Sequence, residues 1–135
     1  MLRNVRMGSV GFVFLSAALA LACSGGRDVE VTGSVAAPVG QSVSGPITVS
    51  FLDVISTDET PKSVAETKLD TVGNFKQTVS IEGDTVRVRA VVDSDGNGAC
   101  SAGELWAEAD ATVQDDDTVA PVTVTLGSAP CPAAM

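Results

Sequence analysis

The chain has no histidine and no tyrosine. Without histidine it cannot form a His-based catalytic triad, use an imidazole as a general base, or build the histidine-containing ligand sets of zinc hydrolases. Neither standard form of glycine-rich phosphate-binding loop occurs in it. Pairs of carboxylates can act on glycosides, but the acidic residues that stand out here are spaced as metal ligands. We therefore expect a protein that is not an enzyme.

The first residues have the layout of a secretory signal. Arg3 and Arg6 give a positive start, and residues 10–21 form an apolar run that is too short to span a bilayer permanently. No polar face recurs at helical spacing, which argues against a buried amphipathic helix. The sequence thus predicts a signal peptide over residues 1–22, a short tether over 23–28, and one domain over 29–135.

Residues 19–24, Leu-Ala-Leu-Ala-Cys-Ser, resemble the lipobox of bacterial lipoproteins, although the usual leucine lies one place early. The resemblance implies that Cys23 carries lipid and anchors the protein in the cell envelope, and Ser24 implies sorting to the outer membrane. The alternative is ordinary cleavage after Ala22, which leaves a soluble exported domain. An odd count of three cysteines favours lipidation, because it leaves Cys100 and Cys131 as one pair.

Acidic residues outnumber basic ones, by seventeen to eight. Loss of Arg3 and Arg6 with the leader brings the net charge from −9 to near −11. Such a charge repels nucleic-acid phosphates and anionic lipid surfaces. We therefore expect no nucleic-acid partner, and membrane contact only through an N-terminal lipid. The acid run at residues 115–117 is either a solvated turn or a second metal site.

Apolar residues recur at period two along most of the remaining chain, which is typical of antiparallel strands with one buried face. Residues 105–113 contain good helix formers, but their alternation favours a strand with Trp106 facing outward. With turn signals between the runs, the sequence predicts an all-β fold, an antiparallel β-sandwich of about seven strands. The expected strands lie near residues 29–35, 47–51, 63–69, 75–81, 86–92, 105–113 and 122–126.

Two stretches carry a resemblance to bacterial sandwich modules of the carboxypeptidase-regulatory or prealbumin-like kind. Residues 69–75 read as strand, turn and strand, and residues 86–92 run into a glycine-rich acidic loop. The resemblance covers the middle and end of the chain. It implies an Ig-like or prealbumin-like arrangement of the sheets.

The acidic loop at residues 93–104 matches the calcium-binding loop of EF-hands at every ligand position. Gly98 stands at position six, where the chain must turn sharply. The expected ligands, through side chains, one carbonyl and one water, are Asp93, Asp95, Asn97, Ala99, Ser101 and Glu104. The residues before the loop are β-branched, so we expect an EF-hand-like loop between strands and calcium in a structural role. Turn chemistry alone also favours Asp, Asn and Gly, but it does not explain Glu104 at position twelve.

Cys100 occupies position eight of this loop. If the last strand pairs antiparallel with the strand that follows the loop, it brings Cys131 back beside the metal site. We therefore expect a Cys100–Cys131 disulfide, with two free thiols as the alternative. Without a cation, the clustered carboxylates are expected to repel one another and loosen the loop.

Trp106 is the candidate ligand contact for a second hypothesis, in which the domain binds carbohydrate; the alternative is a residue that merely covers the rim of the sheet. The first hypothesis is a lipid-anchored, calcium-stabilised module that binds or supports an envelope protein or polysaccharide. The sequence does not identify that partner.

Overall fold

The computed structural model describes residues 26–43, 45–97 and 99–132. The predicted signal peptide, Cys23 and Gly98 lie outside these residues. In the described part of the chain no helix is long and apolar enough to cross a membrane.

The fold is all-β, with seven strands and no helix among the described residues, as the sequence predicts. Residues 106–112, which include good helix formers, form a strand because every second side chain packs against the core. The first strand begins at Arg27, two residues before the predicted domain start. The strands are β1 (Arg27–Ala36), β2 (Ile47–Val54), β3 (Lys62–Leu69), β4 (Gly73–Ile81), β5 (Thr85–Val92), β6 (Trp106–Thr112) and β7 (Val122–Thr125).

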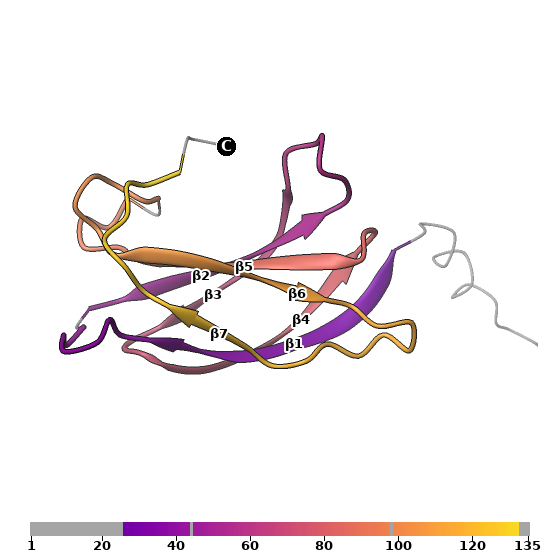
Figure 1. The fold of residues 1–135 in the computed structure, drawn as a ribbon, viewed down its shortest axis with the longest axis horizontal. Helices are drawn as coiled ribbons and strands as arrows, with labels where there is room; N and C mark the ends of the chain where they lie inside the picture. The colour runs from indigo at the N-terminus through magenta and orange to yellow at the C-terminus, as the bar shows by residue number, and fades with distance from the viewer. Residues whose placement is uncertain (1–25, 44, 98, 133–135) are drawn as a thin grey trace, which may run out of the picture.

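The strands form two packed sheets (Figure 1). One sheet has the order β4-β1-β7 and the other has the order β3-β2-β5-β6. All the pairings are antiparallel except that of β1 with β7, which is parallel. This corrects the expected pairing of the last strand with β6. Only the segment after β7 pairs with β6, at an isolated bridge between Gly127 and Trp106.

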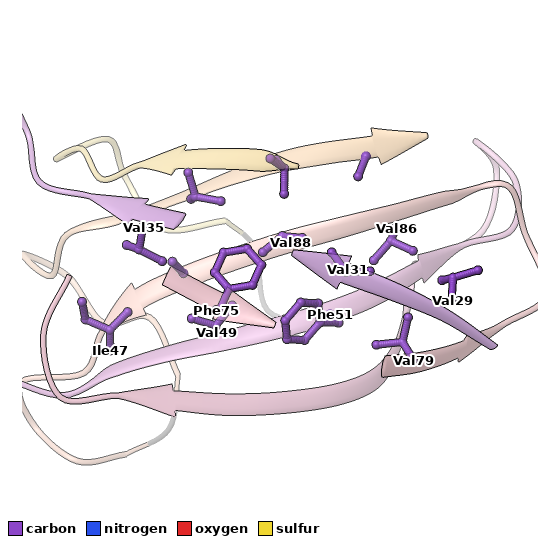
Figure 2. Packing of buried hydrophobic residues seen from close by; sticks show 14 of the residues in the cluster. Val29, Val31, Val35, Ile47, Val49, Phe51, Phe75, Val79, Val86 and Val88 are labelled. Atoms are coloured by element: carbon purple, nitrogen blue, oxygen red, sulfur yellow. The ribbon is translucent and has the colours of Figure 1, made fainter. Parts of the chain in front are cut away.

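Valine, isoleucine and phenylalanine side chains from both sheets fill the space between them (Figure 2). Phe51 of β2 and Phe75 of β4 pack edge to face, with ring centroids 5.6 Å apart, so both phenylalanines point inward as predicted. Gly33 lies opposite Phe75 in the β1–β4 ladder. A Cβ there would overlap the carbonyl of Val122 and the Phe75 ring, so this position requires glycine.

Asp53 is a buried carboxylate that the sequence pattern does not single out. It lies near the end of β2, is 2% exposed, and accepts hydrogen bonds from the backbone N–H groups of Glu82 at 2.7 Å and Gly83 at 3.0 Å. These bonds hold the β4–β5 turn against β2. Its only sequence signal is that it is the single charged residue of its strand, one place before the strand ends.

The two ends of the sandwich carry different segments of the chain. The acidic loop follows β5 at the left of Figure 1, and the segment up to residue 132 lies beside it, tied to it at Cys131. The start of β1 lies at the opposite end, where Arg27 pairs with Asp84 at 2.7 Å and with Asp117 at 3.1 Å. The chain therefore enters the domain at the end remote from the acidic loop.

Candidate metal centre

Backbone hydrogen bonds hold the acidic loop where it leaves and rejoins the sheet. The N–H of Val92 donates to the carbonyl of Leu105 at 2.9 Å, and the N–H of Asp93 donates to Pro46 at 3.1 Å. Within the loop, Gly96 and Gly103 have φ angles of 73° and 90°, which glycine adopts at little cost. The strands thus fix the ends of the loop, and glycines allow it to fold back on itself.

Three carboxylates converge inside this loop. Asp93, Asp95 and Glu104 each offer an oxygen, and these oxygens all lie within 4.8 Å of one another. Calcium takes oxygen ligands at about 2.3–2.6 Å, so two ligands on opposite sides of the ion are about 4.6–5.2 Å apart. The spacing of the three oxygens is therefore compatible with a common ion. Asp93 and Glu104 are buried, being 8% and 7% exposed, whereas Asp95 is exposed. The cluster could hold a metal ion.

Glu104 joins the two halves of the loop through its carboxylate. Its Oε1 accepts the Ser94 N–H at 2.9 Å, the Ser94 hydroxyl at 3.2 Å and the Asp95 N–H at 3.3 Å. Its Oε2 accepts the Ser101 N–H at 2.8 Å. The residue at position twelve thus organises the loop even before any cation is considered.

The aspartates are also hydrogen-bonded by the loop backbone. The N–H of Asn97 donates to both Asp93 Oδ1 and Asp95 Oδ1, each at 3.1 Å. Hydrogen bonds from the Ser101 side chain and the Asn97 backbone hold the pKa of Asp95 below its usual range. These donors offset part of the repulsion among the carboxylates; the loosening of the cation-free loop stays a prediction.

The other three expected ligands are positioned differently. The Asn97 side-chain oxygen accepts the Ala99 N–H at 2.9 Å, and its amide nitrogen donates to the Ser101 hydroxyl at 2.7 Å. The Ser101 side chain is also hydrogen-bonded to Asp95, so Asn97 and Ser101 border the carboxylate cluster. Their role as ligands, with that of the Ala99 carbonyl, stays a prediction.

Cys100 and Cys131 form the expected disulfide, with their Cα atoms 5.7 Å apart. The Sγ of Cys131 lies 3.2 Å from the carbonyl oxygen of Ser101. The C-terminal segment is therefore tied to the acidic loop, although β7 reaches this end in the other sheet.

Trp106 lies at the start of β6, and its indole N–H is bonded within the chain. It donates to the carbonyls of Ala129 at 2.8 Å and Pro130 at 3.1 Å. The Arg89 guanidinium lies 6.0 Å from the centre of the ring. The polar group of this side chain is thus engaged by the C-terminal segment.

The acid run at residues 115–117 forms a hydrogen-bonded turn at the opposite end. Asp116 accepts from the backbone and hydroxyl of Thr118, and these bonds lower the pKa of Asp116 below its usual range. Asp117 pairs with Arg27. Within the described ranges, the acidic loop supplies the one group of acidic side chains that meets the geometric requirement for a metal ion.

No protein-family model matches the chain, and no curated protein matches it. A search of solved structures finds a chain described as an alternative pilotin from the type II secretion system of Vibrio cholerae. That chain is 14% identical, with a TM-score of 0.33, over 74% of this chain and 96% of the pilotin. A likeness this distant assigns neither a family nor an activity.

Proposed function

We propose that this protein is a non-catalytic binding or structural module of the bacterial cell envelope, in which loop 93–104 holds a structural calcium ion. Hard oxygen ligands from carboxylates are the set that calcium takes. The observation that carries the proposal is the convergence of Asp93, Asp95 and Glu104 on one centre.

A calcium ion in this position would act on stability more than on signalling. The loop lies between β5 and β6, so there is no pair of flanking helices for calcium to open. The ion would offset two of the three negative charges of the cluster and fix the end of the sandwich that carries the disulfide. For a module in a calcium-containing compartment, this stabilises the surface that a partner would contact.

The second part of the proposal concerns anchoring. A lipid on Cys23 would lie four residues before Arg27, where β1 begins. Because β1 starts at the end remote from the loop, the calcium end would face away from the bilayer. There it would be accessible to an envelope protein or polysaccharide. Incorporation of a labelled fatty acid, lost in Cys23→Ala, tests the anchor. Equal labelling of the variant, or none in the native protein, contradicts it.

Carbohydrate binding is the weaker alternative. A sugar-binding tryptophan offers an open face and a free indole N–H, whereas the N–H of Trp106 is bonded to Ala129 and Pro130. A polysaccharide panel that changes the Trp106 fluorescence would revive this alternative.

Thermal unfolding of the purified protein with calcium and with chelator tests the proposal. At about one hundred times its dissociation constant, a bound ion stabilises the folded state by about 2.7 kcal/mol, which raises Tm by about 10 °C in a domain of this size. Magnesium should give a smaller shift, because it requires a stricter octahedral geometry.

The matched variants are Asp93→Asn in the cluster and Asp58→Asn in the β2–β3 turn. Both remove one negative charge, but only the first removes it from the carboxylate cluster that would bind the ion. Asp58→Asn should keep the calcium-induced shift and Asp93→Asn should lose most of it. Coincident melting curves for the native protein with calcium and with chelator would reject a structural calcium ion.

A further inference from the structure

The C-terminal segment beyond β7 has two kinds of attachment. Up to Gly127 it belongs to the fold: Leu126 is buried and its N–H donates to Ala36, and Gly127 and Trp106 exchange two backbone hydrogen bonds at 3.0 Å. Residues 128–130 are exposed. The segment 128–132 is therefore an extension that crosses Trp106 without a buried apolar side chain to hold it.

Two features hold this extension in place. One is the indole N–H of Trp106, shared between the carbonyls of Ala129 and Pro130, and the other is the Cys100–Cys131 disulfide. Exposed hydrogen bonds contribute little net stability, because water replaces them when they break. Ordering several residues costs conformational entropy, which a shared hydrogen bond does not offset. The disulfide is thus what keeps the extension over Trp106.

We propose that residues 128–132 form a redox-controlled strap, which the Cys100–Cys131 disulfide closes over Trp106 and which a dithiol reductant opens. A thiolate of the reductant attacks one sulfur of the pair, forming a mixed disulfide and freeing the other cysteine. The second thiolate of the reductant then displaces the remaining cysteine. Two electrons pass to the pair, both cysteines become thiols, and the reductant becomes a disulfide.

Opening the strap has two consequences in the structure. The indole N–H of Trp106 loses both carbonyl acceptors and turns to solvent. The loop also loses its covalent tie at Cys100, next to Ser101, whose N–H donates to Glu104 Oε2. The first consequence needs no metal ion. The second rests on the proposed function, since it predicts weaker calcium binding when the pair is reduced.

Trp106 gives a direct readout, because it is the one tryptophan of the chain. In chelator, reduction should shift its emission to the red. Exchange of the Trp106 indole N–H, which donates to the carbonyls of Ala129 and Pro130, should become faster by about tenfold or more, whereas β7 should stay folded. The double variant Cys100→Ser, Cys131→Ser should show the open-strap spectrum without reductant and should not respond to it.

Unchanged emission and slow exchange after full reduction would overturn the strap. So would unfolding of both sheets on reduction, because the disulfide would then hold the whole fold and not the extension. Both results are read in chelator, so they do not depend on calcium binding.

Calcium titration of the oxidised and reduced protein tests the link to the loop. Weaker affinity after reduction supports it, and by linkage calcium should make the disulfide harder to reduce by the same factor. Equal affinity in both redox states would show that the strap and the loop are uncoupled. If the oxidised protein does not bind calcium, both the structural calcium site and its link to the strap are rejected. The strap itself would still be decided by the emission and exchange measurements in chelator.

Discussion

The Glu104 carboxylate accepts hydrogen bonds from the loop backbone and is also a proposed calcium ligand, and replacing it separates these two roles. In Glu104→Gln the side chain keeps its shape and one acceptor oxygen, but it loses its charge and presents an amide N–H₂ where the second oxygen was. The structure gives the native carboxylate short bonds to the N–H groups of Ser94 and Ser101. The variant can keep only one of them.

The magnitude follows from these contacts. Hydrogen bonds to a charged group contribute about 1.5–3 kcal/mol each, so Glu104→Gln should lower the free energy of unfolding by about 2 kcal/mol in chelator. Saturating calcium at about one hundred times the native dissociation constant adds about 2.7 kcal/mol to the native protein and almost nothing to the variant. The difference between the two proteins should therefore rise to between about 4 and 5 kcal/mol in calcium.

Urea unfolding in the two buffers measures both differences. Glu66→Gln is the matched control, because this exposed residue of β3 loses the same charge away from the loop. A native-like stability of Glu104→Gln in chelator would show that the carboxylate does not hold the loop. The same stability difference in both buffers would show that Glu104 is not a calcium ligand.

Changes at three further features of the scaffold (Asp53, Gly33 and the disulfide) can be measured by urea unfolding. Asp53→Asn should lower the free energy of unfolding by about 1–2 kcal/mol. Asp53→Ala should lower it more, because alanine leaves the N–H groups of the β4–β5 turn without their acceptor. Equal losses in the two variants would show that Asp53 does not act as that acceptor. Gly33→Ala should cost at least about 1–3 kcal/mol through overlap with the Val122 carbonyl, whereas Gly127→Ala, with open space around it, should be nearly neutral. Removing the disulfide, which spans 31 residues, should lower the free energy of unfolding by about 3–4 kcal/mol, because the unfolded chain gains conformational entropy. An unchanged urea midpoint would contradict this entropic explanation.

The alternation of apolar and polar residues predicts the strands, because side chains along a strand point in turn toward the core and toward solvent. In β6 the alanines point toward the core while Trp106, Glu108 and Asp110 point outward, so period two outweighs the helix propensity of the residues. Residues 63–69 show the weakest alternation, yet they form β3. Alternation at an edge strand is poor because both faces are partly wet.

Pairing partners cannot be read in the same way. The alternation of β7 shows that one face is buried, but it does not say which strand supplies the hydrogen bonds. The ladder joins β7 to β1, almost the whole domain away in sequence. The expected position of Cys131 is nevertheless correct, because the end of the sandwich that β7 reaches depends on strand direction and not on the sheet that contains it.

The composition of the site can be predicted from the sequence, but its internal bonding cannot. The ligand spacing of Asp93, Asp95 and Glu104 is enough to predict that their three carboxylates lie together. The backbone donors that stabilise them depend on the folded path of the loop, which includes positive φ angles at Gly96 and Gly103. The sequence therefore predicts the repulsion among the carboxylates but not the backbone donors that offset part of it.

Titration calorimetry of the oxidised, metal-free protein with calcium tests the central claim most directly. The account predicts one saturable site per chain, with a dissociation constant of about 10⁻⁴–10⁻³ M, as in other extracellular modules. The heat should disappear in Asp93→Asn and persist in Asp58→Asn. No saturable heat at millimolar calcium, or the same isotherm for both variants, would show that the three carboxylates do not form a calcium site.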